Sequence, residues 1–82
     1  MQENIMNQTA APTWRSGSQA TFADIGGARY CVSQIDILDP FKGYMVERNG
    51  VAITGPDLVG QPAGHRTVEA AQRYAEQYAA QG

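Results

Sequence analysis

Cys31 and His65 are the two side chains of this sequence that could together perform nucleophilic chemistry. The chain has one Cys and one His, and a thiol becomes a nucleophile when a neighbouring His, held by a third group, takes its proton. Cys31, however, lies between Tyr30 and Val32 in an apolar run, where a small buried hydrophobe is common. No Asn or Asp stands in a motif that would orient His65. We therefore expect Cys31 to be structural, and we expect no catalytic residue and no enzyme activity.

His65 lies in a glycine-rich segment just before a helix start. It could face a ligand held by first-turn amides, but a solvated loop His is the commoner arrangement. Neither "DIGGAR" nor "GPDLVGQPAGH" has the spacing of a phosphate-binding loop or a dinucleotide fingerprint. A single Cys also leaves a Cys-based zinc site without ligands. The sequence predicts no cofactor and no metal.

An aromatic residue beside a cation, Phe41-Lys42, follows Pro40 in the turn "DPFKG". Such a pair at a turn often marks a contact point, although Phe41 could instead tuck under the sheet edge. Trp14 stands in an otherwise polar stretch, where it could dock on the domain. We predict four candidate residues for protein contact: Trp14, Phe41, Lys42 and His65.

The charges and aromatic residues give little support to nucleic-acid binding. The net charge is −2 and the six basic residues are scattered, whereas proteins held by phosphate contacts carry a basic stripe. Tyr30 and Tyr44 resemble the aromatic residues of those sheet faces on which nucleic-acid bases stack. Both, however, fall on the face that we expect the helix to cover. Core packing is therefore the better account of these two tyrosines.

Two hairpins are predicted by turn residues with alternating flanks. Gly26-Gly27 suits a tight turn, and closing it with Ile25 and Ala28 sets Asp24 across from Arg29. Asn49-Gly50 is the strongest short hairpin signal in the chain. Its predicted core face holds alternate residues: Tyr44, Val46, Val51 and Ile53. Between the hairpins the apolar phase slips, which predicts either a bulge near Ser33-Gln34 or two short strands.

A C-terminal helix is predicted from about Val68 to Ala80, with Thr67 as its N-cap. Its apolar stripe is formed by residues at helical spacing: Val68, Ala71, Tyr74, Ala75, Tyr78 and Ala79. A hairpin alone is marginal in water, so this stripe should cover the sheet of its own chain. Packing against a second copy is the alternative, so a monomer is expected and a homodimer stays open.

The elements together predict an α+β fold, ββββα: a three- to four-stranded antiparallel meander with one C-terminal helix across one face. Residues 1–18 form an expected flexible segment and residues 19–82 a single domain. No apolar run is long enough to span a bilayer, and the N-terminal stretch has neither a basic start nor an apolar core. With one Cys and hence no internal disulfide, we expect a cytoplasmic protein without membrane contact.

Residues 29–78, "RYCVSQIDILDPFKGYMVERNGVAITG…HRTVEAAQRYAEQY", resemble small accessory proteins of phages, prophages and plasmids. In that group a short "GY-x-V…NG" meander precedes a "T-x-E-x-A-x-x-x-A" helix, and some members are similar to anti-CRISPR or antirestriction inhibitors. The resemblance implies an inhibitor or accessory factor from a mobile element. We expect an interaction module that binds another protein; the alternative is a nucleic-acid-associated module that uses sheet-face or loop aromatics.

Overall fold

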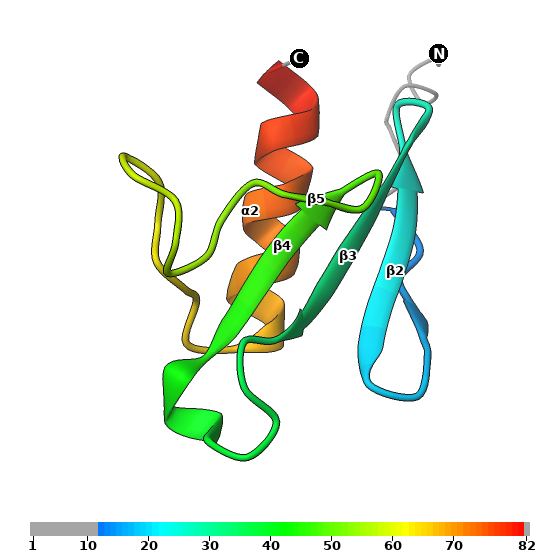
Figure 1. Ribbon diagram of the computed structural model, residues 1–82. Coiled ribbons are helices and arrows are strands. Elements are labelled where there is room, and N and C mark those ends of the chain that lie inside the picture. Colours follow the sequence, from blue (N-terminus) through cyan, green and yellow to red (C-terminus); the bar gives the residue numbers. More distant parts are fainter. Residues whose placement is uncertain (1–11, 82) are drawn as a thin grey trace, which may run out of the picture.

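The computed structural model describes residues 12–81, and it consists of one antiparallel sheet with a helix on one face (Figure 1). Residues 1–11 of the segment 1–18, which the sequence predicts to be flexible, lie outside the described residues. The sheet order is β1-β2-β3-β4-β5. The elements are β1 (Arg15–Ser16), β2 (Ala20–Ile25), β3 (Ala28–Gln34), the 3₁₀ turn η1 (Pro40–Lys42), β4 (Tyr44–Arg48), β5 (Val51–Ala52) and α2 (Val68–Gln81).

The hairpin β2–β3 confirms the predicted register. Gly26 and Gly27 have φ of 61° and 84°, the left-handed region that a two-residue hairpin turn requires and that glycine adopts without a Cβ penalty. Six facing pairs follow, including Asp24 opposite Arg29. The Arg29 Nε donates to Asp24 Oδ1 (3.3 Å). The turn and the opposite charges therefore favour the same alignment.

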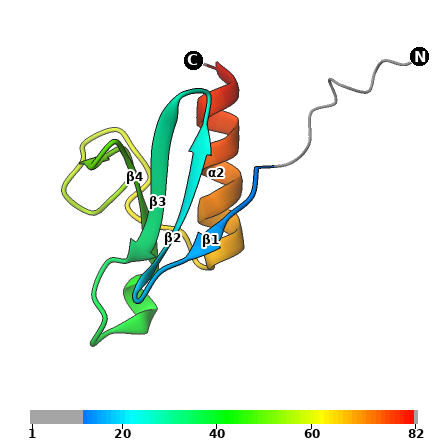
Figure 2. The ribbon, with the colours of Figure 1, turned by 90° about the vertical axis from the view of Figure 1, so that its right-hand side faces the viewer.

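The sheet has one strand more than the sequence predicts, because β1 lies within the segment 1–18. Arg15 and Ser16 pair with Phe22 and Thr21 of β2. Just before this strand, the Trp14 Nε1 donates to Glu76 Oε2 of α2 (2.9 Å), and the indole packs against the core. Part of the segment 1–18 therefore belongs to the sheet, and Figure 2 shows β1 at the edge of the sheet beside α2.

The hairpin β4–β5 confirms the Asn49-Gly50 turn, with φ of 51° and 82°, but its fifth strand is short. Only Arg48–Val51 and Glu47–Ala52 face each other in the ladder. Val51, predicted in the core, is 67% exposed. The reason is that α2 packs over β3 and β4, so β5 lies at the sheet edge beyond the reach of the helix.

After β5 the chain leaves the sheet edge and returns to it. Residues 55–64, here called the edge loop, run outward from β4 (Figure 1). The Gly55 N–H donates to the Pro62 carbonyl (3.0 Å), which closes the neck of the loop. His65 then pairs with Tyr44 of β4, exchanging both backbone hydrogen bonds at 2.8 Å. The edge loop is therefore an excursion from the edge of the sheet that begins and ends against β4.

The segment after β3 forms neither the predicted bulge nor a further strand. β3 ends at Gln34, and the Ile35 N–H donates to the Gly43 carbonyl (3.0 Å) at the base of a turn. The predicted bulge would return Ile35 and Ile37 to one face, but in the structure Ile35 is partly buried and Ile37 is exposed. The turn is favoured because Asp36 and Asp39 cap its backbone amides, a local alternative to strand pairing.

The helix α2 confirms the predicted cover of the sheet. The Ala70 N–H donates to Thr67 Oγ1 (3.0 Å), so Thr67 is the N-cap. Ala71 and Ala75 are fully buried, and their small side chains let α2 approach the strands closely. The core they close contains Ala28, Tyr30, Val32 and Val46. Tyr78 stays partly exposed, with its ring edge-on to that of Tyr30 at 6.4 Å.

Candidate functional site

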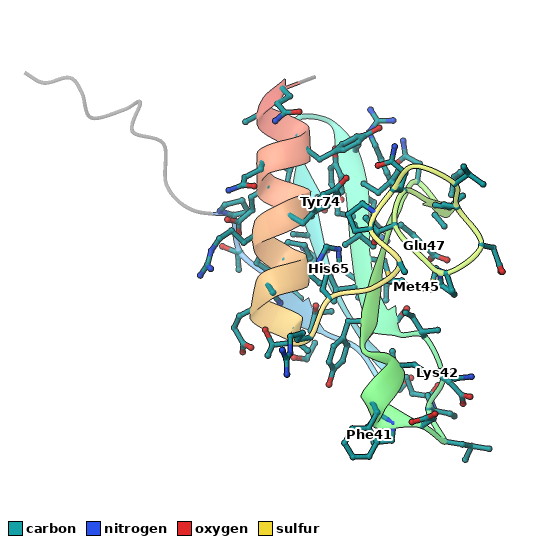
Figure 3. All side chains as sticks on the ribbon, turned by 90° about the vertical axis from the view of Figure 1, so that its left-hand side faces the viewer. Phe41, Lys42, Met45, Glu47, His65 and Tyr74 are labelled. Carbon is teal, nitrogen blue, oxygen red and sulfur yellow. The ribbon has the colours of Figure 1, made fainter. Side chains whose placement is uncertain are left out.

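The turn between β3 and β4 presents three large apolar side chains to solvent. Leu38 is 89% exposed, Phe41 97% and Ile37 56%. We call these three residues the apolar tip. The sequence leaves two positions open for Phe41, and the structure has the exposed one rather than the one under the sheet edge; Figure 3 shows its ring at the far end of the molecule from the C-terminus.

The backbone beneath the apolar tip is held by two aspartates. The Leu38 N–H donates to Asp36 Oδ1 (2.9 Å), and the Phe41 N–H donates to Asp39 Oδ1 (3.2 Å). Backbone bonds from the Asp39 N–H to the Asp36 carbonyl (3.0 Å) and from the Lys42 N–H to the Asp39 carbonyl (3.1 Å) close two turns. The pKa of Asp36 is lowered, first by the Leu38 N–H and then by Lys42. The exposed side chains therefore stand on a well-bonded backbone.

A mostly apolar groove of about 640 Å³ lies between η1 and the returning end of the edge loop. Its size falls in the range of about 300–1,000 Å³ that is usual for small-molecule pockets. Ten residues line it: Ile35, Pro40, Phe41, Lys42, Gly43, Pro56, Ala63, Gly64, His65 and Arg66. Phe41, Lys42 and His65, three of the four predicted contact residues, are thus brought to one groove.

Two glycines allow the backbones on the two sides of the groove to meet. Gly43 has φ of 84°, and a Cβ there would collide with the carbonyl oxygen of His65. A Cβ on Gly64 would lie 2.8 Å from Ile35 Cδ1 and 3.0 Å from the Lys42 carbonyl oxygen. The close approach of the Gly43 and His65 backbones is what the Tyr44–His65 bridge requires. The two sides of the groove are therefore joined by backbone contact as well as by side chains.

His65 is an anchor for the edge loop rather than the solvated loop residue that the sequence predicts. Its ring packs on Tyr74 of α2 with centroids 5.0 Å apart (Figure 3). Its Nε2 is buried and has no hydrogen-bond partner among the described residues. Burial lowers the pKa of His65 because the charged imidazolium would be desolvated. The side chain therefore favours its neutral form and packs on α2, and His65 is also among the residues that line the groove.

The groove carries two cations and no carboxylate among its lining residues. The Lys42 Nζ lies 3.4 Å from Asp36 Oδ2, in a pair whose two side chains are both substantially exposed. An ammonium has three donors, so this contact leaves others available. Arg66 is exposed, and it has no ion-pair partner within residues 12–81. The groove is thus locally basic, although the whole chain has a net charge of −2.

Trp14, the fourth predicted contact residue, is not among the residues that line the groove. Its indole joins the start of the described chain to the middle of α2 through Glu76. The ring is partly buried against the core. The contact is therefore intramolecular, as the predicted docking of Trp14 on the domain implies.

Cys31 and His65 do not form a nucleophile–base pair. Cys31 faces Phe22 and Glu47 across the sheet, on the side of the strands away from the α2 face that Tyr30 and Val32 occupy. His65 packs on α2 itself. Burial, and then the charge of Glu47, raise the pKa of the Cys31 thiol, which disfavours the thiolate. The position and protonation of Cys31 both suit a structural role.

Ile37, Leu38 and Arg66 are surface features that were not predicted from the sequence. The bulge predicted near Ser33-Gln34 would have returned Ile37 to the face of Val32, and it does not form. The signal against this is the spacing of Asp36 and Asp39 before Pro40, because Asp side chains that cap nearby amides favour turns. Arg66 carries no local signal, since its place beside η1 depends on the return of the edge loop.

Neither a metal centre nor a membrane span is found in the part of the chain that the structure describes. Within residues 12–81 no group of three or more His, Cys, Asp or Glu residues gathers as metal ligands would. None of the described helices has the length and apolar character needed to cross a bilayer. Comparisons with protein-family models, with curated proteins and with solved structures find no match to this chain.

Proposed function

We propose that this protein is a small interaction module that works by binding another protein through the apolar tip and the adjoining groove. The observation that carries the proposal is the exposure of Ile37, Leu38 and Phe41 within five residues. Exposed apolar residues scattered singly are ordinary, whereas a cluster at one place marks a contact surface. Here the cluster adjoins a groove, so a partner can contact both protruding apolar side chains and a recess.

The bonded backbone beneath the tip supports this proposal energetically. Binding costs conformational freedom for every loop that must be ordered. The hydrogen bonds from backbone amides to Asp36 and Asp39 order the loop before a partner binds. Less of the favourable contact energy is therefore lost to the entropy cost of ordering the loop. An aromatic anchor such as Phe41 then supplies a large apolar area at one point, as aromatic interface residues commonly do.

The cellular setting belongs to the same proposal. The resemblance of residues 29–78 to phage and plasmid accessory proteins favours an inhibitor or accessory factor from a mobile element. The separation of Cys31 from His65 supports action by binding instead of catalysis. A single Cys that makes no disulfide suits a reducing compartment, so we infer that the protein acts in the cytoplasm.

A nucleic-acid-associated role is the alternative, and the structure gives it less support. Tyr30 is buried under α2, where it cannot stack on a base. Arg15 and Arg29 both pair with Asp24, at 3.4 and 3.3 Å. Gel shifts at low salt with single- and double-stranded probes test this role, because phosphate contacts weaken as salt rises. Salt-sensitive binding at micromolar protein would favour the alternative over a protein partner.

Photocrosslinking in the native host tests the protein-binding proposal directly. A benzophenone amino acid replaces Leu38, whose exposed side chain can be exchanged without disturbing the core. We expect a discrete adduct with one host or element-encoded protein, identified by mass spectrometry. The matched control carries the same amino acid at Val59, which is 100% exposed in the edge loop.

Comparison of adducts at the two positions distinguishes specific binding from non-specific association. An adduct formed at position 38 and lost when Phe41→Ser is added supports binding through the apolar tip. Equal adducts at positions 38 and 59, or no adduct at position 38, would overturn the proposal. Circular dichroism confirms that each variant keeps the α+β fold.

A further inference from the structure

We propose that the groove binds a short acidic peptide segment of the partner, with an apolar side chain in the recess and carboxylates at Lys42 and Arg66. This inference rests on the proposed function and names the chemistry of what is bound. Its basis is charge complementarity. A mostly apolar recess with two lining cations and no lining acid lies on a chain whose net charge is −2.

The shape of the site favours a side chain over a flat surface. The groove is a recess of about 640 Å³ between η1 and the edge loop, and Phe41, which lines it, projects at the lower end of the molecule in Figure 3. An aliphatic side chain can enter such a recess and contact Ile35 and Pro40, which line it. A bilayer surface would contact the apolar tip alone, since it has no projection to fill the recess.

The cations favour a carboxylate in preference to a neutral partner. Lys42 and Arg66 line the groove from two different segments, η1 and the residue after His65. Asp36, which pairs with Lys42, does not line the groove. A guanidinium can bind a carboxylate through two parallel hydrogen bonds. An acidic segment placed between the two cations would therefore gain contacts that a neutral or basic segment would lack.

The geometry of the groove depends little on side-chain rearrangement. The Tyr44–His65 bridge holds its two sides together with two backbone bonds of 2.8 Å. Gly43 and Gly64 bring the backbones close enough that a Cβ at either position would meet the opposite segment. The positions of the Lys42 and Arg66 backbones are therefore fixed on the two sides of the groove, and their exposed side chains extend from these fixed points.

Fluorescence anisotropy with four labelled peptides tests the proposal on the full chain. The probe alternates leucines with aspartates; the three controls replace aspartate by serine, aspartate by lysine, or leucine by glycine. We expect only the leucine–aspartate peptide to bind, with Kd of about 0.1–1 mM, because ordering a flexible peptide offsets much of the contact energy. Amide shifts in a ¹⁵N spectrum should centre on Gly43, Gly64 and Arg66.

Charge variants show whether the two cations carry the selectivity. Arg66→Glu and Lys42→Glu should each weaken binding of the leucine–aspartate peptide by about 3- to 10-fold, since an attraction is replaced by a repulsion. Arg73→Glu is the matched control, because Arg73 is an exposed cation of α2 that does not line the groove. It should leave the Kd unchanged within about two-fold.

Every other occupant is a measurable outcome of the same series. Equal binding of the serine or lysine peptide, or no binding by the leucine–aspartate peptide, would overturn the inference. So would flotation with phosphatidylcholine–phosphatidylglycerol vesicles that is lost in Phe41→Ser, or a dimer in sedimentation that buries the groove. A negative peptide series with a specific adduct at position 38 rejects only the peptide chemistry, whereas loss of the adduct rejects the proposed function.

Discussion

The hairpins β2–β3 and β4–β5 both turn on two residues with positive φ, Gly26-Gly27 and Asn49-Gly50, yet they differ in length. Six facing pairs follow the first turn and two follow the second. The first residue after the turn also differs. Ala28 is buried in the core, whereas Val51 is 67% exposed. A turn of the same kind therefore fixes the pairs next to it without fixing the extent of the strand.

The second hairpin stops because Thr54 takes over the pairing of Val46. The Val46 carbonyl accepts from both the Ile53 and the Thr54 N–H, at 2.9 and 3.3 Å. The Val46 N–H then donates to Thr54 Oγ1 at 2.9 Å, so a side chain stands where a backbone carbonyl would continue the ladder. The two bonding groups of Val46 are satisfied, and the chain is free to leave the sheet. Strand length here depends on what else the partner strand can bind.

Removing a core side chain from the first hairpin should have the largest effect. Tyr30→Ala should lower the free energy of unfolding by about 3–5 kcal/mol, because a buried aromatic ring leaves a cavity beneath α2. Val51→Ala should change it by less than about 0.5 kcal/mol, as exposed substitutions usually do. Urea unfolding followed by circular dichroism measures both. A loss at Val51 close to that at Tyr30 would show that β5 is packed.

Removing the Thr54 hydroxyl should have the next largest effect and tests why β5 is short. Thr54→Val keeps the shape of the side chain but leaves the buried Val46 N–H without an acceptor, which should cost about 1–3 kcal/mol. Thr54→Ser keeps the hydroxyl and should retain most of that stability. Hydrogen exchange at the Val46 amide should accelerate in Thr54→Val. If Val and Ser variants are equally stable, the hydroxyl is not what ends the strand.

Valine at the second turn glycine of each hairpin should give a smaller difference. Gly27 and Gly50 have φ of 84° and 82°, and a Cβ at either would meet no atom within 4 Å. Backbone strain alone should therefore act, at about 1–2 kcal/mol for Gly27→Val. Gly50→Val should cost less, since opening two pairs relieves the strain. Thermal unfolding of the two variants measures this order, and the reverse order would mean that β4–β5 is the stronger hairpin.

Acid should produce the smallest effect, through His65, the residue that follows the edge loop. The pKa of His65 is lowered in the folded state by burial, so the unfolded chain binds the proton more readily. The contribution of neutral His65 to the free energy of unfolding should therefore be fully present above the unfolded-state pKa of about 6.5. It should fall as pH drops from there through the folded pKa. Urea midpoints across pH 7 to 5 measure the loss.

The variant His65→Phe separates this titration from the acid response of the carboxylates. It keeps a ring against Tyr74 but cannot bind a proton, so its urea midpoint should not change with pH between pH 7 and 5. Asp24 and Asp36, whose pKa values are lowered by their bonding partners, lose their contributions only at lower pH. An equal fall in the variant and the original protein would remove His65 as the cause.

The first hairpin, the second turn and α2 could be predicted from sequence because their determinants are local. Gly26-Gly27, the Asp24–Arg29 pair and the Thr67 cap each act over a few residues. The early end of β5 could not be predicted, because Thr54 replaces a backbone acceptor only after β4 is in place. The docking of Trp14 on Glu76, 62 residues away, and the anchoring of His65 on Tyr74 likewise depend on tertiary packing.

The same distinction between local and tertiary determinants applies to the candidate site. Phe41 and Lys42 were recognisable because an aromatic residue and a cation follow a proline in a turn. The exposure of Ile37 and Leu38 could not be predicted from hydrophobic spacing, which does not register that Asp36 and Asp39 cap nearby amides. The groove itself has no sequence signature, since its two sides come from segments about twenty residues apart and meet through Gly43 and Gly64.

The neck of the edge loop makes this part of the chain tolerant of added length. Gly55 and Pro62 are joined at 3.0 Å, so residues between them can change in number while Thr54 and His65 keep their bonds to β4. Each doubling of a flexible loop costs only about 0.6 kcal/mol of closure entropy. A guest peptide grafted after Val59, which is fully exposed and does not line the groove, would be displayed to solvent without entering the sheet. The protein thus offers a small scaffold on which a second specificity can be built apart from the first.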